Sequence, residues 1–202
     1  MAVKVHSLDG RIVEAATAEF LAHGFQKASL HKIADRAGIT TGALYNRYQN
    51  KDALFCSLVS DLMTEIGAQM APVAARYQYA HESRSAAALL DAIRSEEKIY
   101  LDLLYEHYDA CVLLFCKSTG STLETQMNQM MAQKASQTVE FFRTMARHDL
   151  DFDGIELIMS QQFSYYRMIL LRGYTKEKAV SCMETVDTFV EAGWKAIFDQ
   201  IL

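Results

Sequence analysis

Residues 29–48 constrain the fold of this chain more than any other segment, because they encode two short helices joined by a tight turn. Ser29 can accept hydrogen bonds from the free N–H groups at the start of a helix. The apolar residues that follow recur at the i, i+3, i+4 and i+7 spacing of one helix face, and these are Leu30, Ile33, Ala34 and Ala37. Gly38 comes next, where the chain leaves the helix with a positive φ that glycine adopts at little cost. The segment therefore predicts a helix over 30–37 and a turn directly after it.

Thr40 then caps a second predicted helix, which continues to about residue 48. Leu44 and Tyr48 lie one turn apart and are expected to point inward. The residues left on the outer side are Thr41, Gly42, Tyr45, Asn46 and Arg47. The spacing of Ala34, Gly38 and Leu44 is typical of a helix-turn-helix, whose second helix lies in the DNA major groove. An αα-corner with no role in DNA binding has the same local pattern, so the flanking segments decide between the two.

Both flanks favour DNA binding. Residues 11–24 predict an amphipathic helix that ends at Gly24 and supplies a third helix for a small core. Asn50 predicts the cap of a long helix that begins at Lys51. A cation in the first turn of a helix opposes the macrodipole by roughly 0.3–1 kcal/mol, whereas a DNA phosphate bound there would make it favourable. Asp52 could equally offset the lysine, so the argument from Lys51 leaves both explanations open.

A larger set of positions now forms a recognisable pattern. The set consists of Arg11–Val13, Phe20, Gly24, Phe25, Ser29, Leu30, Ile33, Ala34, Ala37–Tyr45, Tyr48 and Asn50–Leu54. It resembles the N-terminal signature of the tetracycline-repressor (TetR) family of bacterial transcription regulators and covers about the first quarter of the chain. The resemblance implies an all-helical homodimer that binds palindromic operator DNA and is released when a small molecule enters the C-terminal domain.

By position, the resemblance also implies which residues contact DNA. Thr41, Gly42, Tyr45, Asn46 and Arg47 match the groove-facing helix, and Ser29, Tyr45 and Lys51 match phosphate contacts. The complete expected set is Ser29, Thr40, Thr41, Gly42, Tyr45, Asn46, Arg47 and Lys51. Two positions depart from the family pattern, because Ala28 stands where relatives often have threonine and Arg47 where histidine is common.

Composition is consistent with an all-α chain of two domains. The sequence has 202 residues, of which 50% are hydrophobic and one is proline, so a sizeable helical core is expected. We expect a helix-turn-helix DNA-binding domain of three helices over residues 1–50 and a helical effector-binding and dimerisation domain over 51–202. Residues 1–55 hold seven Lys and Arg against five Asp and Glu, although the whole chain has a net charge of −5. The contacting region is therefore locally basic, as DNA binding requires.

Targeting signals and cofactor motifs are not apparent. The first residues contain no apolar leader and no run of 18 apolar residues occurs, which predicts a cytoplasmic protein. Cys56, Cys111, Cys116 and Cys182 show no CxxC pairing, and their apolar neighbours indicate reduced, buried thiols. No nucleophile–base pair or phosphate loop is visible, so we expect neither an enzyme nor a cofactor.

The C-terminal region predicts four further helices. Pro72 is expected to end the long helix, and helices follow over about 85–105 and from about residue 122 to His148. The last two helices carry wide apolar stripes, which pack either on the chain's own core or on a second copy. The resemblance favours a four-helix dimer interface. The expected interface residues are Phe163, Tyr166, Leu170, Phe189, Gly193, Trp194 and Ile197.

A small-molecule pocket is expected where polar groups meet an apolar wall. If the helix through residue 100 continues past Glu106, one face gathers Tyr100, Leu104, His107, Tyr108, Cys111 and Phe115. Met131 is expected to adapt the shape of this pocket. Ordinary core packing explains each of these residues as well.

Two other functional classes compete with a DNA-binding regulator. A metal-dependent sensor or enzyme could use Glu106, His107, Asp109 and Cys111, although these do not follow the i, i+3 or i+4 spacing of a dedicated site. The chain could also be a helical interaction module whose helix-turn-helix does not bind DNA.

Overall fold

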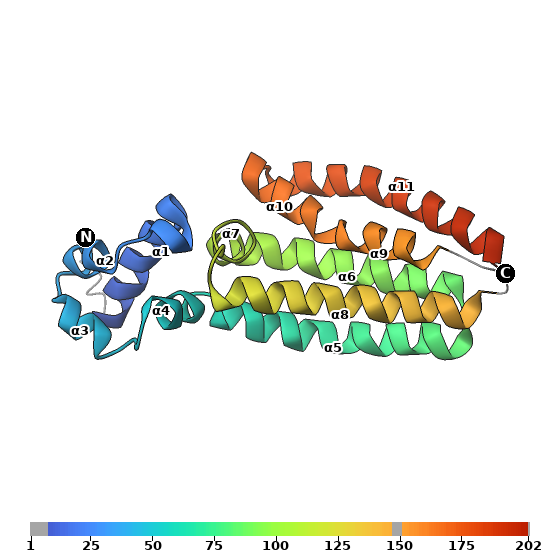
Figure 1. The fold of residues 1–202 in the computed structure, drawn as a ribbon. Helices are drawn as coiled ribbons and strands as arrows, with labels where there is room; N and C mark the ends of the chain where they lie inside the picture. Colours follow the sequence, from blue (N-terminus) through green and yellow to red (C-terminus); the bar gives the residue numbers. More distant parts are fainter. Residues whose placement is uncertain (1–7, 147–150, 202) are drawn as a thin grey trace. The chain divides into compact units, whose positions relative to one another are not determined.

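The computed structural model describes residues 8–146 and 151–201, and every regular element within these ranges is a helix (Figure 1). The chain divides into two compact units. The N-terminal unit consists of Met1–Met63 and His107–Met127, and the C-terminal unit consists of Thr64–Glu106 and Asn128–Leu202. The expected all-α fold class is confirmed, whereas the domain boundary at residue 50 remains a prediction. Within the described ranges, no helix combines the length and hydropathy needed to cross a membrane.

The first four helices and α7 belong to the N-terminal unit. These are α1 (Leu8–Lys27), α2 (Leu30–Ala37), α3 (Thr41–Tyr45), α4 (Lys51–Ser57) and α7 (Tyr108–Cys116). The ring of Phe20 lies 4.9 Å from that of Phe55, and Phe25 lies 5.2 Å from Phe55. Gly24 adopts a φ of 70° inside α1, and the following Phe25 N–H donates to the Lys117 carbonyl at 2.8 Å. This bond ties the end of α7 to the first helix.

The long helix predicted from Lys51 is interrupted, which corrects the sequence-based expectation. Helix α4 ends at Ser57 and α5 (Ser60–Ser83) begins three residues later. The Ser57 hydroxyl donates to the Leu54 carbonyl at 2.7 Å, and the Ser60 hydroxyl donates to the Ser57 carbonyl at 3.0 Å. Side-chain bonds of this kind compete with the helical ladder and favour a break.

Pro72 was expected to end a helix, and this prediction is wrong because Pro72 lies inside α5. A proline within a helix removes one backbone hydrogen bond and costs about 3 kcal/mol. The apolar stripe of α5 nevertheless continues on both sides of it, since Leu62, Ile66, Val73 and Ala80 are all buried. Burial of this stripe outweighs the local penalty and keeps the chain helical to Ser83.

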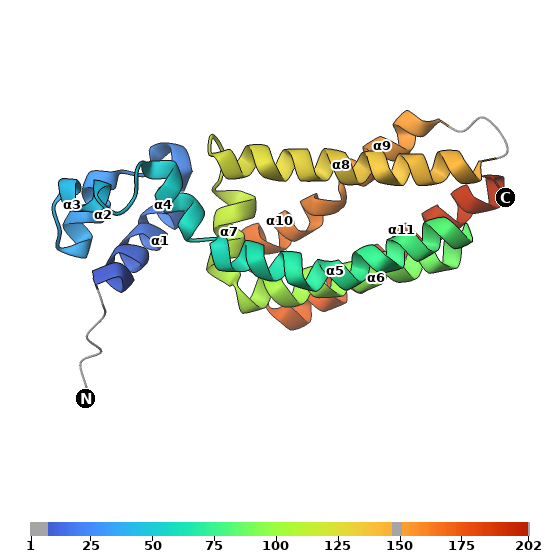
Figure 2. The ribbon, with the colours of Figure 1, turned by 90° about the horizontal axis from the view of Figure 1, so that it is seen from below.

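The C-terminal unit contains six helices or parts of helices among the described residues. They are α5, α6 (Ala86–Glu106), α8 (Thr122–Met145), α9 (Phe152–Ser160), α10 (Gln162–Arg172) and α11 (Lys176–Ile201). Helix α11 packs on α6, and the same two helices lie together in Figure 2. Phe142 of α8 stacks on Trp194 and Phe198 of α11, with ring centroids 5.2 and 5.1 Å apart. The core of this unit therefore joins α8 to the last helix.

The other predicted helix ends differ by a few residues. Helix α6 stops at Glu106 because His107 has φ −122° and ψ 46°, so the break that the sequence left open near Glu106 is real. Helix α3 is shorter than predicted, and Tyr48 lies in the turn beyond it. Helix α8 ends at Met145, and the predicted end at His148 lies outside the described residues.

Candidate nucleic-acid interface and ligand cavity

The turn between α2 and α3 is formed as the sequence predicts. Ser29 caps α2, and its hydroxyl accepts a hydrogen bond from the Lys32 N–H at 3.4 Å. Gly38 has φ 69°, and the Ile39 N–H reaches back to the Ala34 carbonyl at 3.0 Å. A side chain at residue 38 would be strained in this conformation. The turn therefore depends on glycine, and it fixes the direction in which α3 leaves α2.

Helix α3 presents a polar and aromatic surface. The Thr40 hydroxyl accepts from the Ala43 N–H at 3.1 Å, which caps the helix, and Leu44 is buried beneath it. The opposite side contains Gly42, Tyr45, Asn46 and Arg47, all exposed, together with the half-buried Thr41. The Tyr45 ring is 51% exposed. An exposed ring and polar groups on one side suit contact with another surface.

Arg47 is paired within the chain. Its Nε donates to Asp9 Oδ1 at 2.8 Å, and Asp9 lies in the first turn of α1. The side chains of Arg47 and Asp9 are 39% and 69% exposed, so the pair lies in contact with solvent. An ion pair this exposed is worth at most about 1 kcal/mol and exchanges readily for a stronger anion.

Lys51 has a structural role that the sequence did not indicate. Its ammonium donates to the carbonyls of Gln26 and Ala28 at 3.0 and 3.1 Å. The same group lies 5.0 Å from the centroid of the Phe25 ring. Lys51 thus fastens the start of α4 to the connection between α1 and α2. A phosphate at this position would have to accept the third ammonium N–H or replace a carbonyl.

The start of α4 is also bonded to the start of α8 within the N-terminal unit. Asp52 accepts hydrogen bonds from the Thr122 hydroxyl and from the Thr122 backbone N–H, the latter at 2.9 Å. Partial burial raises the pKa of Asp52, but the bonds from Thr122 outweigh this effect and hold the pKa below its ordinary value. The carboxylate is therefore charged at neutral pH and anchors α8 next to Lys51.

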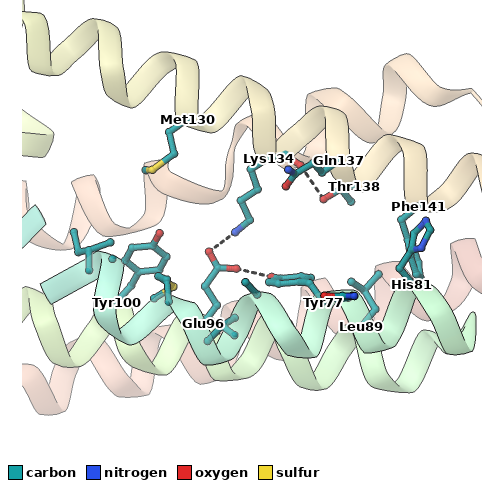
Figure 3. Close-up of a pocket in the computed structure, with 16 residues that line it drawn as sticks. Tyr77, His81, Leu89, Glu96, Tyr100, Met130, Lys134, Gln137, Thr138 and Phe141 are labelled. Atoms are coloured by element: carbon teal, nitrogen blue, oxygen red, sulfur yellow. Dashed lines mark hydrogen bonds and ion pairs between the residues drawn. The ribbon is translucent and has the colours of Figure 1, made fainter. Parts of the chain in front are cut away.

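A cavity of about 540 Å³ lies within the C-terminal unit, between α5, α6 and α8 (Figure 3). The apolar part of its wall includes Ile66, Met70, Val73, Leu89, Met130 and Phe141. The polar groups that line it include Tyr77, His81, Glu96, Tyr100, Lys134, Gln137 and Thr138. This size and this mixture of apolar wall and few polar groups are typical of small-molecule sites.

Glu96 is the chemical centre of the cavity. It is 3% exposed, and its carboxylate accepts hydrogen bonds from the Tyr77 hydroxyl and the Lys134 ammonium, as Figure 3 shows. Burial and the nearby charge of Glu96 raise the pKa of Tyr77 far above its ordinary value, so its hydroxyl remains a donor. These three residues come from α5, α6 and α8 and hold the helices together at mid-cavity.

The predicted pocket residues are only partly brought together. Tyr100 lines the cavity, and Met130 does so in place of the predicted Met131. Leu104 is buried on α6 without lining the cavity. The remaining four, His107, Tyr108, Cys111 and Phe115, belong to the N-terminal unit. The break at His107 ends the helix on which all six residues were assumed to share a face.

Sequence reasoning missed Tyr77, Glu96 and Lys134. One signal was available for Glu96, because it continues the stripe of Leu89, Ile93 and Tyr100 at helical spacing. An acidic residue on an otherwise apolar face indicates a buried charge, and a buried charge needs a partner. The partners come from α5 and α8, and no local spacing identifies them.

The predicted interface residues fall into two groups. Phe163, Tyr166, Leu170 and Trp194 are buried within this chain, where Tyr100 contacts Phe163 and Phe142 stacks on Trp194. Phe189 is 77% exposed, Gly193 is exposed and Ile197 is half-buried. Further exposed apolar side chains on α9, α10 and α11 are Leu157, Ile158, Met168, Leu171 and Val180.

The cysteines differ in their burial. Cys111 is buried, and burial raises its pKa to about 12, so the free group is a neutral thiol. Cys56, Cys116 and Cys182 are half-buried and so more accessible than the sequence predicted.

Comparisons with known proteins agree with the geometry of α2 and α3. Residues 12–58 match the model of "Bacterial regulatory proteins, tetR family". A similar curated protein is the "Probable acrEF/envCD operon repressor" of Escherichia coli (strain K12), which is 46% identical over 44 residues, 22% of this chain and 20% of that protein. The match thus covers about a fifth of that relative's length.

Solved structures extend the likeness of fold to nearly the whole chain. A TetR-like transcriptional regulator from Rhodococcus sp. RHA1 has a TM-score of 0.62 at 16% identity, covering 95% of this chain and 100% of that chain. The fatty acid degradation regulator FadR from Bacillus halodurans has a TM-score of 0.57 at 14% identity, covering 91% and 97%. At these identities the likeness concerns the fold alone.

Proposed function

We propose that this chain, whose residues 12–58 match the model of the TetR family of bacterial regulatory proteins, is a sequence-specific DNA-binding transcription regulator. The observation that carries the proposal is the α2–turn–α3 unit, with a glycine-dependent turn and an exposed polar face on α3. A helix presented in this way fits the major groove.

The proposed DNA contacts fall into two groups, base contacts from the exposed face of α3 and phosphate contacts from the starts of α2, α3 and α4. Tyr45, Asn46 and Arg47 are the residues we assign to base edges and groove walls, with Thr41 and Gly42 allowing close approach. Ser29, Thr40 and Lys51 lie at helix starts, where hydroxyl, ammonium and backbone N–H groups bind phosphate. Arg47 would exchange Asp9 for DNA on binding.

The cavity supports regulation by a small molecule. We infer that the protein is a repressor released from its operator when an effector fills the space between α5, α6 and α8. The similar Escherichia coli protein carries the name of an operon repressor, which favours repression over activation. Helices α5 and α8 each begin in the N-terminal unit and continue into the C-terminal unit, so a change at the cavity has a covalent route toward α4.

We further propose that the protein acts as a homodimer on a palindromic operator. Phe189, Leu171 and Leu157 are exposed apolar side chains on the last three helices, and a second copy is the partner that would bury them. A two-fold dimer reads two half-sites about 34–36 Å apart, which requires a palindrome. As a regulator of chromosomal DNA it would work in the cytoplasm and carry out no enzymatic reaction.

Fluorescence anisotropy with the DNA upstream of the protein's own gene tests this function. Tyr45→Ala should weaken specific binding by roughly 1–3 kcal/mol if the ring positions α3 in the groove. Tyr79→Ala is the matched control, because Tyr79 is a 64% exposed tyrosine on α5 of the other unit. The proposal fails if the parent protein prefers no sequence in that DNA over unrelated DNA, or if the two variants lose affinity equally.

A further inference from the structure

We propose that the cavity binds a ligand with a positively charged nitrogen on an apolar body, and that Lys134 occupies the cation site of that ligand in the free protein. The inference deepens the proposed function, since it names the chemical class of effector for the cavity. It rests on the arrangement of Glu96, Tyr77, Phe163 and Lys134.

These groups form a cage around a cation. The Lys134 ammonium bonds to the Glu96 carboxylate and lies 5.9 Å from the Tyr77 ring centroid and 5.7 Å from that of Phe163. A carboxylate together with aromatic rings within about 6 Å is the arrangement by which proteins bind organic cations. In this structure the cation inside the cage belongs to the chain itself.

Lys134 can leave the cage, whereas Glu96 cannot. The Lys134 side chain is 20% exposed and that of Glu96 is 4% exposed. Lysine carries its charge on a flexible four-carbon stem and can move its ammonium into water. Glu96 is buried and is held by the Tyr77 hydroxyl, a bond that Figure 3 shows. A ligand cation would therefore replace Lys134 and find the carboxylate already in position.

The surrounding charges favour a cation over an anion. Glu97 and Asp187 lie close to each other and to Glu96, and burial with these neighbouring charges raises the pKa of Glu97 to about 8. A ligand carboxylate at Lys134 would place another negative group beside Glu96. A ligand cation instead leaves the charge of the cage unchanged once Lys134 has moved out.

The rest of the cavity specifies the apolar body. Beyond Glu96 and Lys134 the wall combines apolar side chains such as Val73, Leu89 and Phe141 with the polar side chains of His81, Gln137 and Thr138. Met70 and Met130 are flexible and can adjust to ligands of different shape. A volume of about 540 Å³ accommodates a molecule of drug size rather than a small amine.

Replacement of Lys134 by a ligand cation would also break the ion pair that links α8 to α6. The Lys134–Glu96 pair ties α8 to α6, and α8 begins at Thr122, which bonds to Asp52 beside Lys51. Freeing α8 at mid-cavity allows the helix to shift, and a continuous helix transmits a shift along its length. The geometry therefore connects the cation cage to the helix start that we assign to phosphate.

Calorimetric titration of the full chain with decyltrimethylammonium and with decanoate tests the inference, since the two probes share an alkyl chain and differ in charge. The parent protein should bind the ammonium compound more tightly than decanoate. Glu96→Gln should weaken the ammonium compound at least about tenfold, as expected on losing a charged partner. Lys134→Met should strengthen it by a similar factor because the competing ammonium is gone. Lys98→Met, at an exposed lysine of α6, is the control.

Several outcomes would overturn the inference. They are tighter binding of decanoate, unchanged ammonium binding in Glu96→Gln, weaker ammonium binding in Lys134→Met, and binding of neither probe by the parent. A cooperative thermal unfolding transition shows that each variant is folded. If Lys134→Met is unfolded, Glu96→Gln still tests the inference, because glutamine has nearly the shape of glutamate. The calorimetric titration uses no DNA. A negative result in the DNA-binding assay therefore does not change its outcome, and a negative titration does not contradict DNA binding.

Discussion

Lys51 has a structural role here and a proposed role in DNA binding, and replacing it with methionine separates the two. Its ammonium fastens α4 to the carbonyls of Gln26 and Ala28, and we also assign it to a DNA phosphate. Methionine retains an apolar stem beside Phe25 and removes the charge. The two roles then affect different quantities. Loss of the hydrogen bonds to Gln26 and Ala28 lowers the stability of the free protein, whereas loss of the phosphate contact changes the affinity of the protein for DNA.

The structural loss follows from the contacts. Hydrogen bonds from a charged donor contribute about 1.5–3 kcal/mol when shielded from water, but the Gln26 carbonyl is exposed and that of Ala28 is part-buried, so about 1 kcal/mol is the appropriate value. The cation over Phe25 adds about 0.5 kcal/mol. For a chain of this length, each kcal/mol lowers the melting temperature by about 2–4 °C. Lys51→Met should therefore melt a few degrees below the parent.

The loss of a phosphate contact follows from counterion release. Each phosphate neutralised contributes about 0.9 to the slope of log affinity against log salt, so a dimer that loses two contacts should show a slope smaller by about 2. Anisotropy titrations over a series of salt concentrations measure it, with Lys98→Met as the control for a lysine in the other unit. Unchanged melting would refute the fastening role, and an unchanged slope would refute the phosphate contact.

Three further predictions concern other charges and surfaces. Asp9→Asn should strengthen DNA binding by up to about 1 kcal/mol in anisotropy titrations, because it frees Arg47; weaker binding would contradict the exchange of partners. Phe189→Asp should give a folded monomer in light scattering, whereas Trp194→Asp should unfold the chain because Trp194 stacks on Phe142; a dimer in Phe189→Asp would remove this residue from the interface. The pKa of Glu97 is raised from 4.5 to about 8, so the folded state binds more protons between these values and stability declines as pH rises through them. Glu97→Gln should melt above the parent at pH 9, and equal melting temperatures there would contradict the raised pKa.

The sequence predicted the parts of this protein that depend on local contacts. Ser29, Gly38 and Thr40 determine caps and a turn within three or four residues of themselves, and each behaves as expected. Pro72 shows the limit of local rules, because burial of residues on both sides of it keeps α5 helical. A pocket was predicted and Tyr100 lines it, but the cluster at Glu96 could not be predicted, since Tyr77 and Lys134 lie 19 and 38 residues from Glu96 in the sequence. No periodic pattern encodes a meeting of that kind.

Three cations that take part in the proposed binding events are each paired inside the free chain, two that would contact DNA and one that a ligand would displace. Arg47 pairs with Asp9, Lys51 with backbone carbonyls, and Lys134 with Glu96. Binding then exchanges one partner for another, and the net gain is the difference between the two interactions. An exposed pair such as Arg47–Asp9 is weak, so its loss on binding should reduce DNA affinity only slightly. The pair at Glu96 is buried and costs more to separate, so a ligand must supply both a cation and enough apolar surface to offset the loss. A small amine lacks that surface, and the cavity should therefore respond to amphiphilic cations while ignoring the simple amines of metabolism.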